Sequence, residues 1–156
     1  MKKLKALEIL QQSRLRPTKA RVLILSTLTG NPGHLCPDEI LKTFRAKSIP
    51  FSPATLYQNL NKLTQAGLLR CIQGLDDKMH FDANLEPHHH LACLQCGRIA
   101  DIKFDVPVEK HMRYLFQEET DSLDQWHLQA DWWLLKGICP KCRPSTEMPA
   151  TTKMAS

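Results

Sequence analysis

Apolar residues in the first half of the chain recur every three or four positions, which is the spacing of amphipathic helices. The pattern predicts four helices, at about residues 4–12, 18–28, 37–47 and 53–66. Threonine or serine at N-cap positions and proline at first helical positions mark the starts of the later helices, and glycine at position 67 ends the fourth. This half of the chain is therefore expected to be mainly helical.

Two short strand-like runs follow the fourth helix, at residues 68–72 and 78–82, with turn residues between them. Helices followed by a two-stranded hairpin are typical of a winged helix-turn-helix, a DNA-binding module. In this interpretation residues 53–66 form the recognition helix and residues 68–82 form the wing.

The second half of the chain is predicted to combine strands with one helix. Strand-like runs lie at residues 99–104, 123–128 and 132–138, and a helix is expected at residues 108–119 after a proline. The last residues, 144–156, are rich in proline, threonine and serine and are expected to be disordered.

The predicted fold class is α+β. An N-terminal winged helix-turn-helix domain is expected at residues 1–84, a small α/β domain at residues 85–143 and the tail at residues 144–156. Charge follows the same division, because residues 1–87 carry 13 basic and 7 acidic side chains, whereas residues 88–156 carry 8 and 9. A basic half joined to a near-neutral half indicates that one part meets a polyanion, although a solvated basic surface gives the same count.

Composition excludes several classes of protein. The chain has 156 residues, 42% hydrophobic and 24% charged, which is typical of a globular protein and not of a disordered one. No apolar run approaches the roughly 20 residues that span a bilayer. The basic N-terminus is not followed by an apolar signal core, so we expect a cytoplasmic protein without a membrane partner.

Four of the six cysteines form two Cys-x-x-Cys pairs, Cys93 with Cys96 and Cys139 with Cys142. Zinc accepts four thiolates in a tetrahedron, and a two-residue spacer lets both sulfurs of a pair reach one ion. The 42 residues between the pairs exceed the roughly 15–20 of a zinc ribbon, so zinc is expected to clip the end of this domain onto its start. A pair of redox dithiols, or simply cysteines buried in the core, is the alternative. The remaining cysteines, 36 and 71, are interpreted as small core side chains.

A second group of candidate ligands contains only nitrogen and oxygen donors. It consists of His34, Asp82, His88, His90 and Asp101. In extended chain His88 and His90 point to one side and His89 to the other. Three imidazoles and two carboxylates suit Fe²⁺, Mn²⁺, Co²⁺ or Zn²⁺, although a histidine triplet is also common as a solvent-exposed run.

Several motifs, taken together, resemble the ferric uptake regulator superfamily of metal-dependent bacterial repressors over about residues 10–143. The motifs are Thr18-Lys19-Ala20-Arg21, His34 before Pro37-Asp38-Glu39-Ile40, Ser52 to Leu60, Gly67-Leu68, Phe81-Asp82, His88 to Gly97 and Gly137 to Cys142. The resemblance implies a homodimer with a C-terminal α/β dimerisation domain, structural Zn²⁺ in the four-cysteine site, and Fe²⁺ or Mn²⁺ (with Zn²⁺ as a surrogate) as the regulatory ion. It also implies that the ion, held in the hinge by the five nitrogen and oxygen ligands, closes the dimer onto a palindromic operator.

The resemblance further implies a regulator that is not an enzyme and has no small-molecule substrate. The basic residues Lys19, Arg21, Lys62 and Arg70 would contact phosphates, and Tyr57 and Gln58 would reach base edges. The expected DNA-binding residues are Lys19, Arg21, Thr55, Tyr57, Gln58 and Lys62.

The ligand pattern looks most like the peroxide-sensing branch, in which an oxidised ligand histidine releases metal and DNA; His34 and His88 are the expected targets. Asp82 stands where zinc-uptake regulators carry cysteine, which disfavours that branch. An iron-uptake regulator, or another divalent-metal-responsive repressor without peroxide sensing, is the alternative. Two features depart from the pattern: Gln58 replaces an arginine common in iron regulators, and the stretch with Trp126, Trp132 and Trp133 is unusual.

Two hypotheses from other classes remain open. A metalloenzyme could use the histidine and aspartate cluster for hydrolysis. A thiol-based redox or structural zinc protein would have no role on DNA. Activity that is lost in an Asp101→Ala variant would favour the first, and absence of salt-dependent DNA binding with metal added would favour the second.

Overall fold

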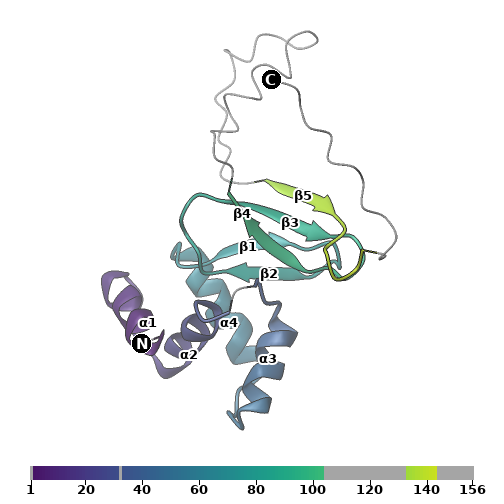
Figure 1. Cartoon of the computed structure of the whole chain (residues 1–156). Helices are drawn as coiled ribbons and strands as arrows, with labels where there is room; N and C mark the ends of the chain where they lie inside the picture. Colours follow the sequence, from purple (N-terminus) through teal and green to yellow (C-terminus); the bar gives the residue numbers. More distant parts are fainter. Residues whose placement is uncertain (1, 32, 104–132, 144–156) are drawn as a thin grey trace, which may run out of the picture.

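Four helices form the N-terminal half of the protein in a computed structural model, which describes residues 2–31, 33–103 and 133–143. The helices are α1 (Lys2–Gln12), α2 (Lys19–Leu28), α3 (Pro37–Ala46) and α4 (Pro53–Gln65). They lie together on one side of two small sheets (Figure 1). All four predicted helices are confirmed, with ends within two residues of the expected positions.

Local hydrogen bonds explain where the helices start. The hydroxyl of Thr18 accepts from the backbone N–H of Arg21 at the start of α2, and the hydroxyl of Ser52 accepts from that of Thr55 at the start of α4. These are the N-caps that the sequence predicts. At α3 the carboxylate of Glu39 accepts from the backbone N–H of Cys36, so this helix is capped from within its first turn.

The apolar faces of the helices meet in one core. Residues of all four helices are almost fully buried there, together with Leu69 and Phe81 from the hairpin region. The largest of them are Phe44 of α3 and leucines and isoleucines that come from all four helices. Burial of these side chains fixes the helices to one another, because each stabilises the fold by about 1.5–3 kcal/mol.

The predicted wing is present as an antiparallel pair, β1 (Arg70–Gln73) and β2 (Met79–Asp82). An isolated bridge joins Leu35, in the loop before α3, to Phe81 in β2, with the Phe81 N–H donating to the Leu35 carbonyl. The wing is therefore attached to the loop between α2 and α3, and this contact brings the residue before Leu35 close to the end of β2.

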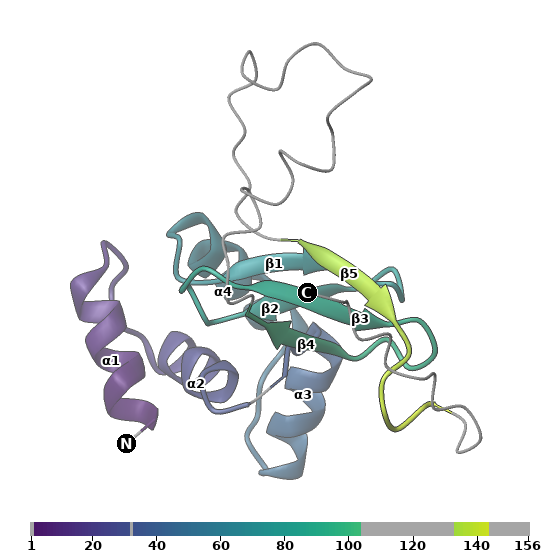
Figure 2. The same cartoon turned by 45° about the horizontal axis from the view of Figure 1, so that its top comes forward.

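The second sheet has three strands in the order β4 (Ile99–Ile102), β3 (His89–Cys93) and β5 (Leu134–Gly137). Figure 2 shows β3 in the middle, beside β4 on one edge and β5 on the other. β3 pairs antiparallel with β4 and parallel with β5. β3 is a strand that the sequence pattern does not predict, and β4 and β5 are shorter than the predicted strands at 99–104 and 132–138.

The α+β class with an N-terminal DNA-binding fold is confirmed. The predicted helix at 108–119, the strand at 123–128, the tail and two of the three tryptophans lie outside the described residues. The domain limits at 84 and 143 stay predictions. Within the described ranges no helix is both long and apolar enough to cross a membrane.

Candidate metal centres

The first centre gathers the four cysteines of the two Cys-x-x-Cys pairs. The Sγ atoms of these cysteines all lie within 4.8 Å of one another; the residues are Cys93, Cys96, Cys139 and Cys142. Parallel pairing of β3 with β5 sets Cys93 opposite Gly137, so both pairs follow the same end of the sheet. Gly97, with φ of 71°, makes the turn that closes the first pair, a conformation that side-chain-bearing residues rarely adopt. None of the six cysteines forms a disulfide.

Hydrogen bonding prepares these sulfurs to bind a cation. The backbone N–H of Cys139 donates to Cys93 Sγ at 3.3 Å and, with the N–H of Cys96, lowers the pKa of the Cys93 thiol to about 6. Side-chain hydrogen bonds to Cys139 and Cys96 raise the pKa of the Cys142 thiol to about 12. Four sulfurs within 4.8 Å of one another are suited to a tetrahedral zinc ion.

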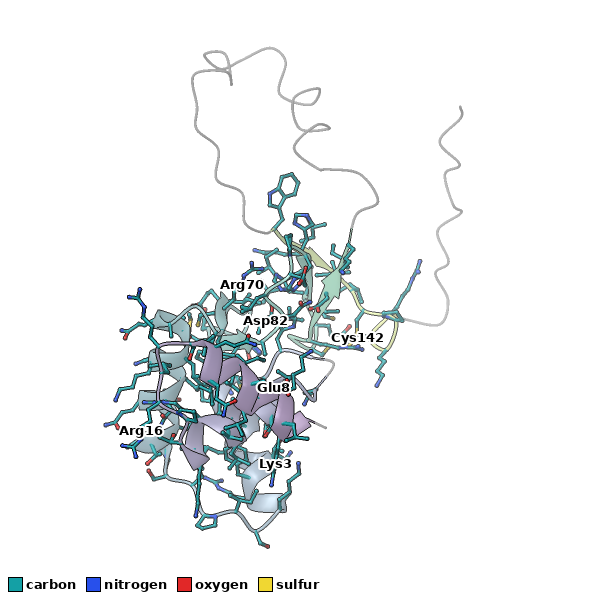
Figure 3. The ribbon with its side chains drawn as sticks, turned by 90° about the vertical axis from the view of Figure 1, so that its left-hand side faces the viewer. Lys3, Glu8, Arg16, Arg70, Asp82 and Cys142 are labelled. Carbon is teal, nitrogen blue, oxygen red and sulfur yellow. The ribbon has the colours of Figure 1, made fainter. Side chains whose placement is uncertain are left out.

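The second centre lies where the wing, the loop between α2 and α3, and the second sheet meet. It contains His34 from that loop, Asp82 at the end of β2, His88 just before β3 and His90 within β3. Their four ligand atoms lie within 4.8 Å of one another, and all four residues are buried. Figure 3 shows Asp82 inside the molecule, between the helices and the segment that carries Cys142.

The three imidazoles converge on one carboxylate oxygen. Asp82 Oδ2 lies 3.1 Å from His88 Nε2 and 3.7 Å from both His34 Nε2 and His90 Nε2. The rings of His34 and His90 are nearly perpendicular, as are those of His88 and His90, so their nitrogens meet without ring stacking. His89 faces away, where its Nδ1 accepts from the Trp133 N–H, as the alternation of an extended chain predicts.

Asp101 completes the predicted set from the edge of the centre. It stands opposite His90 in the β3–β4 register, and its Oδ1 lies 3.2 Å from His34 Nε2 and 3.6 Å from His88 Nε2. Its side chain is 39% exposed, whereas that of Asp82 is 6% exposed. The structure thus brings all five predicted residues together, with Asp101 as the exposed member.

Neighbouring groups orient the imidazoles. His88 Nδ1 donates to the Glu86 carbonyl at 2.7 Å, which leaves the lone pair of Nε2 directed at the cluster. His80, a buried residue that the sequence analysis missed, places Nδ1 3.2 Å from the His34 carbonyl and Nε2 3.1 Å from Asp76 Oδ1. Its position two residues before Asp82 on the same strand face was the only signal in the sequence.

The donor set fits a divalent cation. His34 Nε2, His88 Nε2 and Asp82 Oδ2 are buried, and none has a hydrogen bond of good geometry among the described residues. Burial raises the pKa of the Asp82 carboxyl, but the facing imidazoles of His34 and His90 and the hydrogen bond from the Asn84 N–H lower it more and hold it well below its usual range. An ionised carboxylate facing three imidazoles, with polar atoms left unsatisfied, suits Fe²⁺, Mn²⁺ or Zn²⁺.

The depressed pKa of Asp82 predicts an acid-dependent loss of stability in the metal-free protein. A carboxyl whose pKa is lower in the folded state contributes stability above its unfolded pKa of about 3.9, and this is lost as pH falls below that value. Between pH 6 and pH 3, an Asp82→Asn variant should therefore lose less stability than the unmodified protein. Urea unfolding at each pH measures this, and parallel declines of the two proteins would contradict the expectation.

The candidate DNA face is on α2 and α4. Lys19, Thr55, Tyr57, Gln58 and Lys62 are all exposed, on the side of each helix away from the core. The half-buried Arg21 donates to the Arg16 carbonyl.

Arg70, also expected to contact phosphate, donates to the carbonyls of Leu85 and Glu86. The Arg70 guanidinium therefore holds the linker before β3 by hydrogen bonds, a role that the sequence pattern does not predict. This contact could not be predicted from the sequence, because the two carbonyls lie 15 and 16 residues away from Arg70.

Comparisons with known proteins give matches in sequence and in overall fold. Residues 12–129 match the model of the Ferric uptake regulator family. The chain is 31% identical over 134 residues to the peroxide-responsive repressor PerR of Staphylococcus aureus, covering 86% of each chain. It is similar in fold to the ferric uptake regulator of Helicobacter pylori (TM-score 0.70, 23% identity, 93% of this chain and 94% of that one). It is also similar to that of Vibrio cholerae (TM-score 0.67, 24% identity, 85% and 98%).

Proposed function

The chain belongs to the ferric uptake regulator family of metal-responsive transcriptional repressors, and from this premise we propose that it binds palindromic operator DNA as a homodimer under the control of Fe²⁺ or Mn²⁺. The regulatory ion occupies the centre of His34, Asp82, His88 and His90, with Asp101 as fifth ligand. Zinc in the four-cysteine centre is structural. Such a regulator acts in the cytoplasm, where operator DNA is accessible, and catalyses no reaction on a substrate.

The observation that carries this proposal is that the candidate ligands come from two different parts of the fold. His34 and Asp82 come from the helical half and its wing, whereas His90 and Asp101 come from the second sheet and His88 from the residue just before it. When bound, the ion supplies the positive charge that these donors share. The ligands can all reach it only when the two parts of the chain adopt one relative placement, so binding favours that placement over others.

In the favoured placement the two recognition helices of the dimer would lie one helical turn apart on DNA. Tyr57 and Gln58 of α4 would reach base edges, Thr55 would help to position them, and Lys19, Arg21 and Lys62 would contact phosphates. A coupling of about 1–3 kcal/mol between metal and DNA corresponds to roughly 5–150-fold in operator affinity.

We further propose that the centre senses peroxide. The support is the 31% identity to a peroxide-responsive repressor, together with a ligand set of three imidazoles and two carboxylates. In the net reaction one oxygen atom of hydrogen peroxide is inserted at an imidazole carbon and water is released; the histidine is oxidised by two electrons and the peroxide is reduced. His34 and His88 are the expected targets, because both also face the exposed Asp101.

Brief peroxide treatment tests this proposal. The Fe²⁺-loaded protein should lose operator affinity and gain about 16 Da at His34 or His88, by peptide mass spectrometry. The Mn²⁺-loaded protein is the matched control and should keep both its mass and its affinity. Unchanged binding and mass with Fe²⁺ would instead favour an iron-uptake regulator or another divalent-metal-responsive repressor.

A further inference from the structure

Asn84, which lies in the linker between β2 and β3, contacts both carboxylates of the second metal centre. Its backbone N–H donates to Asp82 Oδ1 at 2.7 Å, and its side-chain Nδ2 lies 3.4 Å from Asp101 Oδ2. These two aspartates belong to different sheets, since Asp82 ends β2 and Asp101 lies in β4. One residue therefore joins the carboxylates of both parts of the chain.

The oxygens that Asn84 contacts are not the ones that face the imidazoles. Asp82 turns Oδ2 towards His34, His88 and His90, and Asp101 turns Oδ1 towards His34 and His88. The opposite oxygen of each carboxylate is the one held by Asn84. In each aspartate, therefore, the oxygen that faces the imidazoles is free of contact with Asn84.

The side-chain amide of Asn84 has only one orientation that satisfies its neighbours. Its Oδ1 accepts from the Glu86 N–H at 3.3 Å, which leaves the Nδ2 donor directed at the Asp101 carboxylate. The same linker supplies the Glu86 carbonyl that fixes the His88 tautomer. Residues 84–86 thus donate to or accept hydrogen bonds from three of the five candidate ligands, Asp82, His88 and Asp101.

We propose that Asn84 is a positioning residue of the second metal centre, which holds one oxygen of each aspartate so that Asp82 and Asp101 each offer the other oxygen to the ion. This inference rests on the proposed function, because it assumes that an ion occupies the centre. Its main effect falls on Asp101, which is 39% exposed and is therefore less constrained by packing than the buried Asp82. Two single-oxygen carboxylates and three imidazoles give five donors, a set suited to Mn²⁺ or Fe²⁺ and too small for Ca²⁺.

The position of Asn84 also explains where a sixth ligand could approach. A cavity of about 270 Å³ lies beside the centre, and Asn84, Asp101, His34 and Lys5 of α1 are among the residues that line it. By holding Asp101 against the imidazoles, Asn84 keeps this carboxylate at the cavity wall. Water or another small polar molecule in this cavity could approach the residues that would hold the ion.

A double-mutant cycle tests the role of Asn84. The variants are Asn84→Ser, Asp101→Ala and the double variant, each studied as the full-length, zinc-containing protein. Serine can still accept from the Glu86 N–H and preserve the turn, but it is too short to reach Asp101. Asn84→Ser should raise the Kd for Mn²⁺ about tenfold. In the Asp101→Ala background the same substitution should change the Kd by less than about twofold, because its partner is gone.

Two further measurements separate positioning from folding. The Mn²⁺ EPR spectrum of Asn84→Ser should differ from that of the unmodified protein, whereas its metal-free unfolding should not. Asn59→Ser is the matched control, because it removes an amide that donates to the Thr55 carbonyl within α4, away from the centre. Its Mn²⁺ affinity should be unchanged.

The possible failures are distinguishable. An unchanged Kd in Asn84→Ser, or an equal increase in the Asp101→Ala background, would overturn the role of Asn84 and leave the proposed function intact. If His34→Ala binds Mn²⁺ as tightly as the unmodified protein, the centre does not hold the ion and both proposals are wrong.

Discussion

Replacement of His34 by alanine is expected to abolish metal-dependent operator binding while the protein remains folded and dimeric with its zinc. His34 is the only ligand from the loop between α2 and α3, and its Nε2 lies close to both Asp82 and Asp101. Without this imidazole the remaining ligands no longer connect that loop to the second sheet. The expected loss is the whole coupling, about 5–150-fold in metal-stimulated DNA affinity.

Fluorescence anisotropy with operator DNA, at fixed salt and with or without Mn²⁺, measures this loss. His89→Ala is the matched control, because His89 belongs to the same histidine run but faces Trp133 on the other side of β3. It should keep the response to metal. Zinc content and dimer mass should be normal in both variants. A His34→Ala protein that still responds to Mn²⁺, or that fails to fold, would contradict a regulatory role for this residue.

Replacement of Cys139 by serine is expected to have the largest effect on stability. Cys139 Sγ lies 3.8 Å from Cys96 Sγ, and its backbone N–H donates to Cys93 Sγ, so it joins the two cysteine pairs directly. Among the described residues, the three-stranded sheet contributes only Ala92 and Ile99 to a small buried apolar cluster, which Ile72 of β1 completes. Structural zinc contributes about 10–16 kcal/mol to the folding of small zinc domains, so its loss should unfold this sheet.

Thermal unfolding and zinc analysis check the second expectation. The Cys139→Ser protein should lose its zinc, its dimer and the cooperative unfolding of the C-terminal part, whereas the helical core persists. Cys71→Ser is the control, because Cys71 is half-buried beside the helical core and lies outside both centres. Its unfolding free energy should change by no more than about 1–3 kcal/mol, with zinc retained. A zinc-free variant with an intact dimer would show that zinc binding by the four cysteines is not needed for the stability of the sheet.

The helical half and the four-cysteine site were predictable because their signals are local. Helix starts depend on a cap and a proline within a few residues, as at Thr18 and Ser52. A Cys-x-x-Cys pair sets the spacing of its own two sulfurs through a single turn. The strand at β3 was missed because its pattern is unremarkable by itself, and its parallel partner β5 lies more than 40 residues away.

By itself, the sequence determined the helices, the wing, the α+β class and the residue types of both metal centres. Only the tertiary structure decided how these residues meet: that Asp82 Oδ2 faces three imidazoles, that Asp101 stands at an exposed edge, and that Arg70 holds the linker. It also decided the roles of His80 and Asn84. The physical reason is range, since capping and periodicity act over one or two turns of chain, whereas ligand geometry depends on contacts between segments that only folding brings together.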